Sequence, residues 1–281
     1  MQSLLYVPGI SERMILKARD SAADGLILDL EDAVAPGQKV EARSTVTRLL
    51  SEVNFNDKEI FVRINTLATE YGLEDARAIA QCNTAGIVIP KVESPDEIVT
   101  VAQLLIEHGN KSSKILCLIE SPRGVLGCRE IAGASDRVVG VLFGAADLSR
   151  DLGCVLSEGE PELLFARSQM LMAARAARVT AFDSPHFVIA DLDGLRQRCQ
   201  AMRNLGYDGK TIIHPSHIAI VNEVFAPSPE AIAEAERIIA AMDAAQAEGR
   251  GAISLDGRLI DQVHLTHAKK ILNQVRKPCE T

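Results

Sequence analysis

Short runs of Val, Ile and Leu recur along the chain between stretches of helical periodicity, and this alternation constrains the fold more than any other feature. Each run is apolar without interruption, whereas a strand with one wet face alternates apolar and polar residues. The runs are therefore typical of parallel strands that are buried on both faces. Eight are present: Leu4–Val7, Gly25–Leu30, Glu59–Ile64, Gly86–Lys91, Lys114–Glu120, Val138–Gly144, Thr180–Asp183 and Lys210–Pro215.

The segments between the runs carry the start and stop signals of helices. Ser11 precedes one helical stretch, Ser94 and Pro95 open a second, and Asp193 with Gly194 opens a third that ends at Gly206. Eight strand–helix units in about 220 residues favour a TIM (β/α)8 barrel, a fold of the α/β class. A doubly wound open sheet is the rival, but it usually has fewer strands.

The chain continues differently after the eighth run. A long Ala-rich helix is predicted after Pro227, followed by a short Gly-punctuated hairpin and a last helix over residues 264–277. We therefore predict a (β/α)8 barrel over residues 1–225 and a C-terminal extension over residues 226–281. The extension is available as a lid or as a contact between subunits.

Composition and charge narrow the classes of partner. The 30 Lys and Arg residues against 38 Asp and Glu residues give a formal net charge of −8, which argues against nucleic acid and against a polybasic membrane contact. Six cysteines are scattered without a Cys-x-x-Cys pair, and this favours a reducing compartment. Neither a membrane span nor a secretion signal is recognised. We expect a cytoplasmic protein.

Acidic residues gather where the predicted strands end, which is where TIM barrels carry their active sites. Arg63 and Lys91 accompany them. An acidic mouth with few histidines favours a hard cation with oxygen ligands, such as Mg²⁺. Glu120 and Asp147 end adjacent strands and could bind one ion, although each could instead cap the following helix. The whole acidic set is Asp29, Glu31, Asp32, Glu93, Glu120, Asp147 and Asp183.

Eight motifs occur in an order and at spacings that resemble a known family. They are L-L-Y-V-P-G, L-D-L-E-D-A-V-A-P-x-x-K-x-x-A-R, V-R-I-N, P-K-V-E, I-E-S, F-G-A-A-D-L, G-K-x-I-I-H-P and G-A-x-x-x-D-G-R-L-I-D. Together they resemble the citrate lyase β-subunit-like acyl-CoA lyases of the HpcH/HpaI aldolase superfamily. The resemblance implies Mg²⁺-dependent cleavage of a 3-hydroxyacyl-CoA thioester, such as (S)-citramalyl-CoA or malyl-CoA, to acetyl-CoA and a 2-keto acid such as pyruvate or glyoxylate.

The resemblance also implies roles for individual residues. Glu120 and Asp147 match the family's two metal-binding carboxylates. Arg63 matches the arginine for the keto-acid portion, although an ion pair with a carboxylate at the end of the second strand could hold as well. Asp261 matches the catalytic acid–base, which a neighbouring subunit's lid supplies over the barrel mouth. A homo-oligomer, a trimer or a hexamer, is therefore expected.

A further group of residues is expected to bind the substrate and coenzyme A. Lys39 and Arg43 lie four residues apart on one face of a predicted helix, where cations suit the phosphates of coenzyme A; a solvated helix face is the alternative. Thr211 and Ile212 are expected to offer backbone contacts. The full set is Tyr6, Arg13, Lys17, Lys39, Arg43, Thr211 and Ile212.

Three positions, Gln2, Ala146 and Val263, depart from the family pattern, so the details of the first strand, the metal site and the lid stay open.

Two other activities suit the same scaffold. A citrate lyase β-subunit would cleave a citryl thioester to oxaloacetate and an acetyl thioester, and a malyl-CoA thioesterase would release free CoA. A non-catalytic CoA-binding protein is a further alternative.

Overall fold

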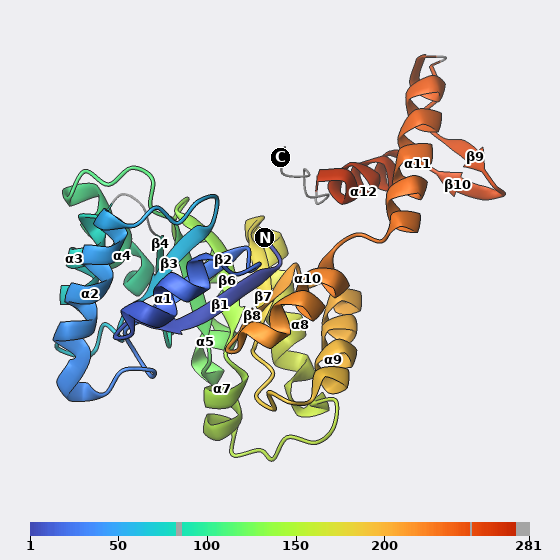
Figure 1. The fold of residues 1–281 in the computed structure, drawn as a ribbon. Coiled ribbons are helices and arrows are strands. Elements are labelled where there is room, and N and C mark those ends of the chain that lie inside the picture. Colours follow the sequence, from blue (N-terminus) through green and yellow to red (C-terminus); the bar gives the residue numbers. More distant parts are fainter. Residues whose placement is uncertain (83–85, 248, 274–281) are drawn as a thin grey trace. The chain divides into compact units, whose positions relative to one another are not determined.

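Eight parallel strands close into one barrel in the computed structural model, which describes residues 1–82, 86–247 and 249–273 (Figure 1). The first strand pairs with both the second and the eighth, and this closes the ring. The predicted TIM barrel is confirmed. The strands are β1 (Ser3–Pro8), β2 (Gly25–Asp29), β3 (Glu59–Arg63), β4 (Gly86–Ile89), β5 (Ile115–Ile119), β6 (Val138–Phe143), β7 (Thr180–Asp183) and β8 (Gly209–Ile212).

The interior of the barrel is filled with apolar side chains. Every residue of β2 and of β5 is buried, as their uninterrupted apolar runs predict. Since a packed interior has no room for a ligand, the chemistry is left to the mouth of the barrel. The inner cluster consists of Leu4, Ile27, Phe61, Val88, Leu116, Leu118, Leu142 and Phe182.

Helices surround the strands (Figure 1). The cap predicted at Ser94 is present as a full capping box with Glu97. The cap predicted at Asp193 is wrong, because the Asp191 carboxylate accepts the Gly194 N–H at 2.9 Å and starts the helix earlier. The helices are α1 (Glu12–Arg19), α2 (Lys39–Glu52), α3 (Gly72–Ala80), α4 (Pro95–Glu107), α5 (Pro122–Leu126), α6 (Cys128–Ala132), α7 (Ala145–Leu152), α8 (Leu164–Ala177), α9 (Leu192–Leu205) and α10 (Ile218–Phe225), with 3₁₀ turns at Pro36–Gln38, Pro161–Leu163 and Pro215–His217.

Two compact units make up the chain, Met1–Glu223 and the part that begins at Val224. The second unit contains α11 (Pro229–Ala247), β9 (Ile253–Leu255), β10 (Arg258–Ile260) and α12 (Gln262–Asn273). The strands β9 and β10 form an antiparallel hairpin. Asp256 and Gly257 at its turn both have positive φ, as a two-residue hairpin turn favours. The core of this unit is formed by Met242, Ile260 and Leu265.

The helix, hairpin and helix that the sequence predicts after the barrel are therefore present in that order. The end of the last predicted helix and Cys279 lie outside the described residues. The described cysteines, at positions 82, 117, 128, 154 and 199, are all free thiols. Among the described residues, no helix has the length and apolar character needed to cross a membrane.

Candidate active site

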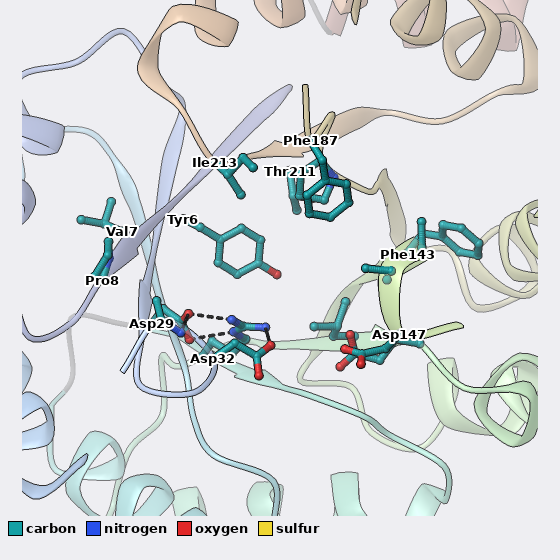
Figure 2. Close-up of a pocket in the computed structure, with 18 residues that line it drawn as sticks. Tyr6, Val7, Pro8, Asp29, Asp32, Phe143, Asp147, Phe187, Thr211 and Ile213 are labelled. Carbon is teal, nitrogen blue, oxygen red and sulfur yellow. Dashed lines mark hydrogen bonds and ion pairs between the residues drawn. The ribbon is translucent and has the colours of Figure 1, made fainter. Parts of the chain in front are cut away.

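The carboxyl ends of the strands surround a cavity of about 420 Å³. Figure 2 shows the carboxylates of Asp29, Asp32 and Asp147 along one side of it, and Phe187 and Ile213 on the opposite side. The phenol of Tyr6 projects between the two sides. A cavity with one charged and one apolar wall suits a small ligand that carries both kinds of group.

Glu120 lies directly after β5 and lines this cavity, where it is 4% exposed. Its Oε1 accepts a hydrogen bond from the backbone N–H of Lys91 at 2.9 Å. Its side chain occupies the space that a side chain at position 144 would need, since a Cβ built on Gly144 would lie 2.3 Å from the Glu120 Cβ and 2.6 Å from Oε2. A glycine at the end of β6 therefore makes room for the carboxylate.

Asp147 reaches the cavity from the first turn of α7, which directly follows β6. Its carboxylate forms an ion pair with Arg150 and lies 3.9 Å from the Lys91 ammonium. Ala146, one of the departures from the family pattern, lines the cavity beside it. The strand ends thus bring Glu120 and Asp147 to one cavity, as expected for adjacent parallel strands.

The pKa of Glu120 is raised to about 8. Burial is the main cause, and the negative charges of Glu31 and Asp147 add to it, whereas Lys91 and Arg63 oppose it. The cations near this carboxylate therefore do not compensate for its burial and for the neighbouring negative charges. A cation bound beside Glu120 would supply the missing positive charge.

These carboxylates fit a hard divalent cation. Neither acts as a helix cap, because Ser121 caps α5 and α7 begins after Gly144. Within the described ranges, no group of three or more His, Cys, Asp and Glu side chains could hold a metal ion. Two carboxylates that leave the remaining positions to water and ligand are how Mg²⁺ is usually held.

Arg63, the last residue of β3, forms the ion pair that the sequence allowed for. Its Nε and Nη2 donate to the two carboxylate oxygens of Asp29 at 2.7 and 2.6 Å. Its Nη1 lies 3.1 Å from oxygens of both Glu31 and Asp32, and its guanidinium stacks 4.9 Å from the ring centre of Tyr6. Burial alone would lower the pKa of Arg63, but Asp29 raises it well above its usual range. A fixed positive charge therefore stands at the cavity wall.

The cations on α2 are already paired. The Lys39 ammonium is buried and donates to the backbone oxygens of Leu30 and Glu31 at 3.0 and 2.6 Å. Arg43 Nε donates to the buried Asp75 at 2.6 Å. The solvated helix face considered as an alternative is wrong, because both side chains hold neighbouring segments together. Their role at the phosphates of coenzyme A stays a prediction.

The other predicted ligand-binding residues are spread over the mouth. Tyr6 and Thr211 line the cavity, whereas Ile212 is fully buried and its neighbour Ile213 lines the cavity instead. Arg13 and Lys17 are exposed on α1. Charged groups on an exposed helix face are available to a phosphate, and this role also stays a prediction.

Asp183 does not belong to the acidic mouth, and that expectation is wrong. It ends β7 but is fully buried, and its carboxylate pairs with Lys210 and, at 3.0 Å, with Arg167. Burial alone would raise the pKa of Asp183, but Lys210 and Arg167 lower it below its ordinary value. This carboxylate therefore serves as the buried partner of Lys210 and Arg167.

Asp261 lies in the second compact unit, between β10 and α12. Its Oδ1 accepts the Val263 N–H at 3.0 Å and contacts His264 Nδ1 at 2.7 Å, so it begins α12 as a cap. The hydrogen bond with His264 lowers the pKa of Asp261. The structure thus shows the local capping role, and the catalytic role remains a prediction.

Lys91 and Gly144, like Phe187 and Ile213, lie at this site although the sequence predicted no specific role for them. Lys91 and Gly144 stand in quoted motifs, P-K-V-E and F-G-A-A-D-L. A glycine between a strand end and a helix was a usable signal of close packing. Nothing in the sequence indicated that the backbone N–H of Lys91 would donate to Glu120.

The chain is similar to known families and proteins. Residues 2–215 match the family model of HpcH/HpaI aldolase/citrate lyase, and residues 165–276 match that of a C-C bond lyase of the TIM-barrel fold. A (3S)-malyl-CoA thioesterase of Cereibacter sphaeroides is 37% identical over 96% of this chain and 93% of its own. A citrate lyase subunit beta of Haemophilus influenzae is 34% identical over 98% of this chain and 97% of its own.

A solved structure extends the likeness to the fold. The crystal structure of protein CitE from Mycobacterium tuberculosis, in complex with magnesium, acetoacetate and coenzyme A, superposes with a TM-score of 0.79. It is 32% identical, and the match covers 97% of each chain. The chain described here therefore belongs to the HpcH/HpaI aldolase/citrate lyase family.

Proposed function

We propose that this chain is a Mg²⁺-dependent carbon–carbon lyase that cleaves a 3-hydroxyacyl-CoA thioester of the (S)-citramalyl-CoA or malyl-CoA type. The products are acetyl-CoA and a 2-keto acid such as pyruvate or glyoxylate. The observation that carries the proposal is the meeting of Glu120, Asp147 and Arg63 at one cavity. The relatives support it, because one is named for malyl-CoA and another binds magnesium, acetoacetate and coenzyme A.

Glu120 and Asp147 are the residues that would hold the ion. A magnesium ion bound there supplies a Lewis acid for the oxygen that becomes the keto-acid carbonyl. Arg63 adds a fixed positive charge for the substrate carboxylate and for the negative charge that develops as the bond breaks. Asp29 keeps this guanidinium in place through two hydrogen bonds. The apolar side chains of Phe187 and Ile213 help to exclude water from the reacting atoms.

We assign the proton transfer to Asp261, which takes the proton of the substrate hydroxyl as the carbon–carbon bond breaks. The electron pair of that bond passes to the acetyl-CoA enolate, which then takes up a proton and leaves as acetyl-CoA. The carboxylate of Asp261 is exposed and its pKa lies below the ordinary value of 3.8, so Asp261 is ionised at neutral pH and can accept a proton. In this proposal Asp261 acts at the barrel mouth of a neighbouring subunit, so the enzyme is a homo-oligomer, a trimer or a hexamer. The reaction takes place in the cytoplasm, where the free cysteines stay reduced.

A malyl-CoA thioesterase is the second candidate, and the 37% identity to a (3S)-malyl-CoA thioesterase favours it. The same cavity would then direct water at the thioester, and the products would be free CoA and an acid. The third candidate, a citrate lyase β-subunit, would require a carrier-bound citryl thioester. Product analysis separates all three.

The test is a product assay on purified protein with a panel of thioesters, with and without Mg²⁺. We expect acetyl-CoA and a keto acid, and a loss of turnover of about 100-fold or more in Glu120→Gln and in Asp147→Asn. Glu93→Gln, which removes a more exposed carboxylate of the same mouth, is the matched control. Mixing Asp261→Asn with Arg63→Ala subunits should restore part of the activity once subunit exchange is demonstrated with tagged chains.

Each alternative has its own outcome in this assay. Free CoA without acetyl-CoA identifies the thioesterase, and turnover of the carrier-bound citryl thioester alone identifies the citrate lyase subunit. Normal turnover of the Glu120 and Asp147 variants at limiting Mg²⁺ contradicts the metal assignment. A mixture that stays inactive after proven exchange contradicts the shared site.

A further inference from the structure

Lys91 has a left-handed backbone beside Glu120, which lines the cavity. Its φ is 50°, a region that residues with a Cβ rarely adopt. The residue lies in a kink, because Ile89 still pairs with Cys117 on β5 while Val92 N–H bonds to the next residue along, Leu118, at 3.2 Å. Ile87 pairs with Ile115 but its N–H bonds to Lys114, so a Val92 N–H bonded to Leu118 places Val92 opposite Ile119. One extra residue therefore lies between Ile89 and Val92.

The kink redirects the backbone N–H of Lys91 away from the strand ladder and onto Glu120 Oε1, at 2.9 Å. In the described part of the chain, this is the one hydrogen bond seen to that carboxylate. The other oxygen, Oε2, lies in the space beside Gly144. The backbone of Lys91 thus engages one oxygen of the carboxylate, Oε1, and not the other.

The side chain of the same residue reaches the other acidic groups. Its ammonium donates to Glu31 Oε1 at 2.6 Å and lies 3.8 Å from Asp32 and 3.9 Å from Asp147. One residue therefore contacts Glu120 through its backbone and Glu31 through its side chain, within 4 Å of Asp147. Unusual backbone conformations persist where the surrounding structure demands them, and they cluster at functional sites.

We propose that Lys91 is the positioning residue of the cation site, and that its left-handed backbone orients Glu120 so that Oε2 is presented to the ion. The inference rests on the proposed function, because it takes Glu120 and Asp147 as the ligands. The essential feature is the backbone conformation, since the N–H is the group that contacts Glu120. The ammonium has the separate task of holding Glu31 beside Arg63.

Two variants isolate the backbone from the charge. Lys91→Asn and Lys91→Val both remove the ammonium, but Asn tolerates a positive φ whereas a β-branched Val resists it. Mg²⁺ binding to the purified protein is measured by titration calorimetry, with no substrate present. We expect Lys91→Val to bind Mg²⁺ about tenfold more weakly than Lys91→Asn, the loss that corresponds to one hydrogen bond to a charged group.

Arg178→Val is the matched control. Arg178 has a φ of 60° at the end of α8, shortly before β7 begins and therefore at the opposite end of the barrel. Val at this position incurs the same backbone penalty, so it should lower the melting temperature and leave the Mg²⁺ affinity unchanged. If Lys91→Val does not fold, Lys91→Ala replaces it, with a smaller loss of affinity expected relative to Lys91→Asn.

Equal Mg²⁺ affinities of the Asn variant and the Val or Ala variant would overturn the inference while the metal assignment stands. A wild-type protein that binds no Mg²⁺ would overturn the metal assignment and this inference with it. A loss of affinity in Arg178→Val as large as that in Lys91→Val would show a general effect of strain, and would overturn the inference alone.

Discussion

Two clusters of charged side chains stand at strand ends of the same barrel, and the pKa values of their buried carboxylates are shifted in opposite directions. Asp183 is fully buried, yet its pKa is lowered, because Lys210 and Arg167 both pair with it. Glu120 is 4% exposed, and its pKa is raised to about 8, because burial and the charge of Glu31 outweigh the nearby cations. The two carboxylates differ in the positive charge around them, and hardly in burial.

This difference separates a structural cluster from a ligand site. Around Asp183 the chain supplies the counter-charges itself, so the cluster is complete. Around Glu120 the carboxylates outweigh the cations, and such a strongly perturbed group in a cavity is a candidate for function. The two clusters also touch, since Arg167 stacks 4.8 Å from the ring centre of Phe143, and Phe143 lines the cavity. The cluster around Asp183 therefore supports Phe143, which is part of the wall of the cavity that Glu120 also lines.

Removing the charge of Asp183 should have the largest effect on stability. In Asp183→Asn, Lys210 and Arg167 remain buried without this counter-charge, and breaking a buried pair in this way costs about 3–5 kcal/mol. Urea unfolding measures the loss. Glu223→Gln, which breaks an exposed pair with Arg196, is the control and should cost far less, because solvent screens an exposed pair. Similar small losses in both variants would mean that the protein does not depend on the pairing of Asp183 with Lys210 and Arg167 for its stability.

Added Mg²⁺ should stabilise the protein through the incomplete cluster. A ligand at 100 times its Kd stabilises a folded protein by about 2.7 kcal/mol, which thermal unfolding with and without the ion detects. Asp147→Asn should lose this gain, because it removes one of the two carboxylates, whereas Asp183→Asn should keep it. An equal gain in Asp147→Asn would locate the ion elsewhere in the protein.

The barrel could be predicted from the sequence because its signal is local. An uninterrupted apolar run such as that of β5 indicates burial on both faces, and parallel topology then places Glu120 and Asp147 at one end. The partners of charged residues could not be predicted in the same way, since they lie far along the chain: Arg43 pairs with Asp75, 32 residues away, and Asp183 with Lys210, 27 residues away. No periodicity encodes such pairs.

The backbone of Lys91 shows the same limit in another form. A glycine or asparagine would have indicated a left-handed residue, but the sequence has a lysine there. The backbone conformation follows from the kink directly after β4, where the chain runs beside β5. This kink exists only in the assembled barrel. Tertiary structure thus determined the features of the site that residue types left open.

Neutralising Glu120 should have the smallest and most pH-dependent effect, and it should be stabilising. The pKa of Glu120 is raised from its ordinary 4.5 to about 8 in the folded protein, so the folded state binds this proton more tightly than the unfolded state. The stabilising contribution of that proton is complete below about pH 4.5 and is lost as the pH rises through about 8. Above pH 8 the folded protein carries a buried carboxylate that lacks sufficient counter-charge.

Glu120→Gln removes that carboxylate and keeps its shape. In the presence of a chelator, we therefore expect the variant to melt a few degrees above the wild type at pH 9, with about 1 kcal/mol corresponding to roughly 2–4 °C for a domain of this size. Near pH 5 the difference should shrink, because the wild-type Glu120 is then protonated. Glu93→Gln, at a more exposed position of the same mouth, should show no such trend. A melting difference that is the same at pH 5 and pH 9 would contradict the shortage of positive charge around Glu120, and with it the contrast to Asp183.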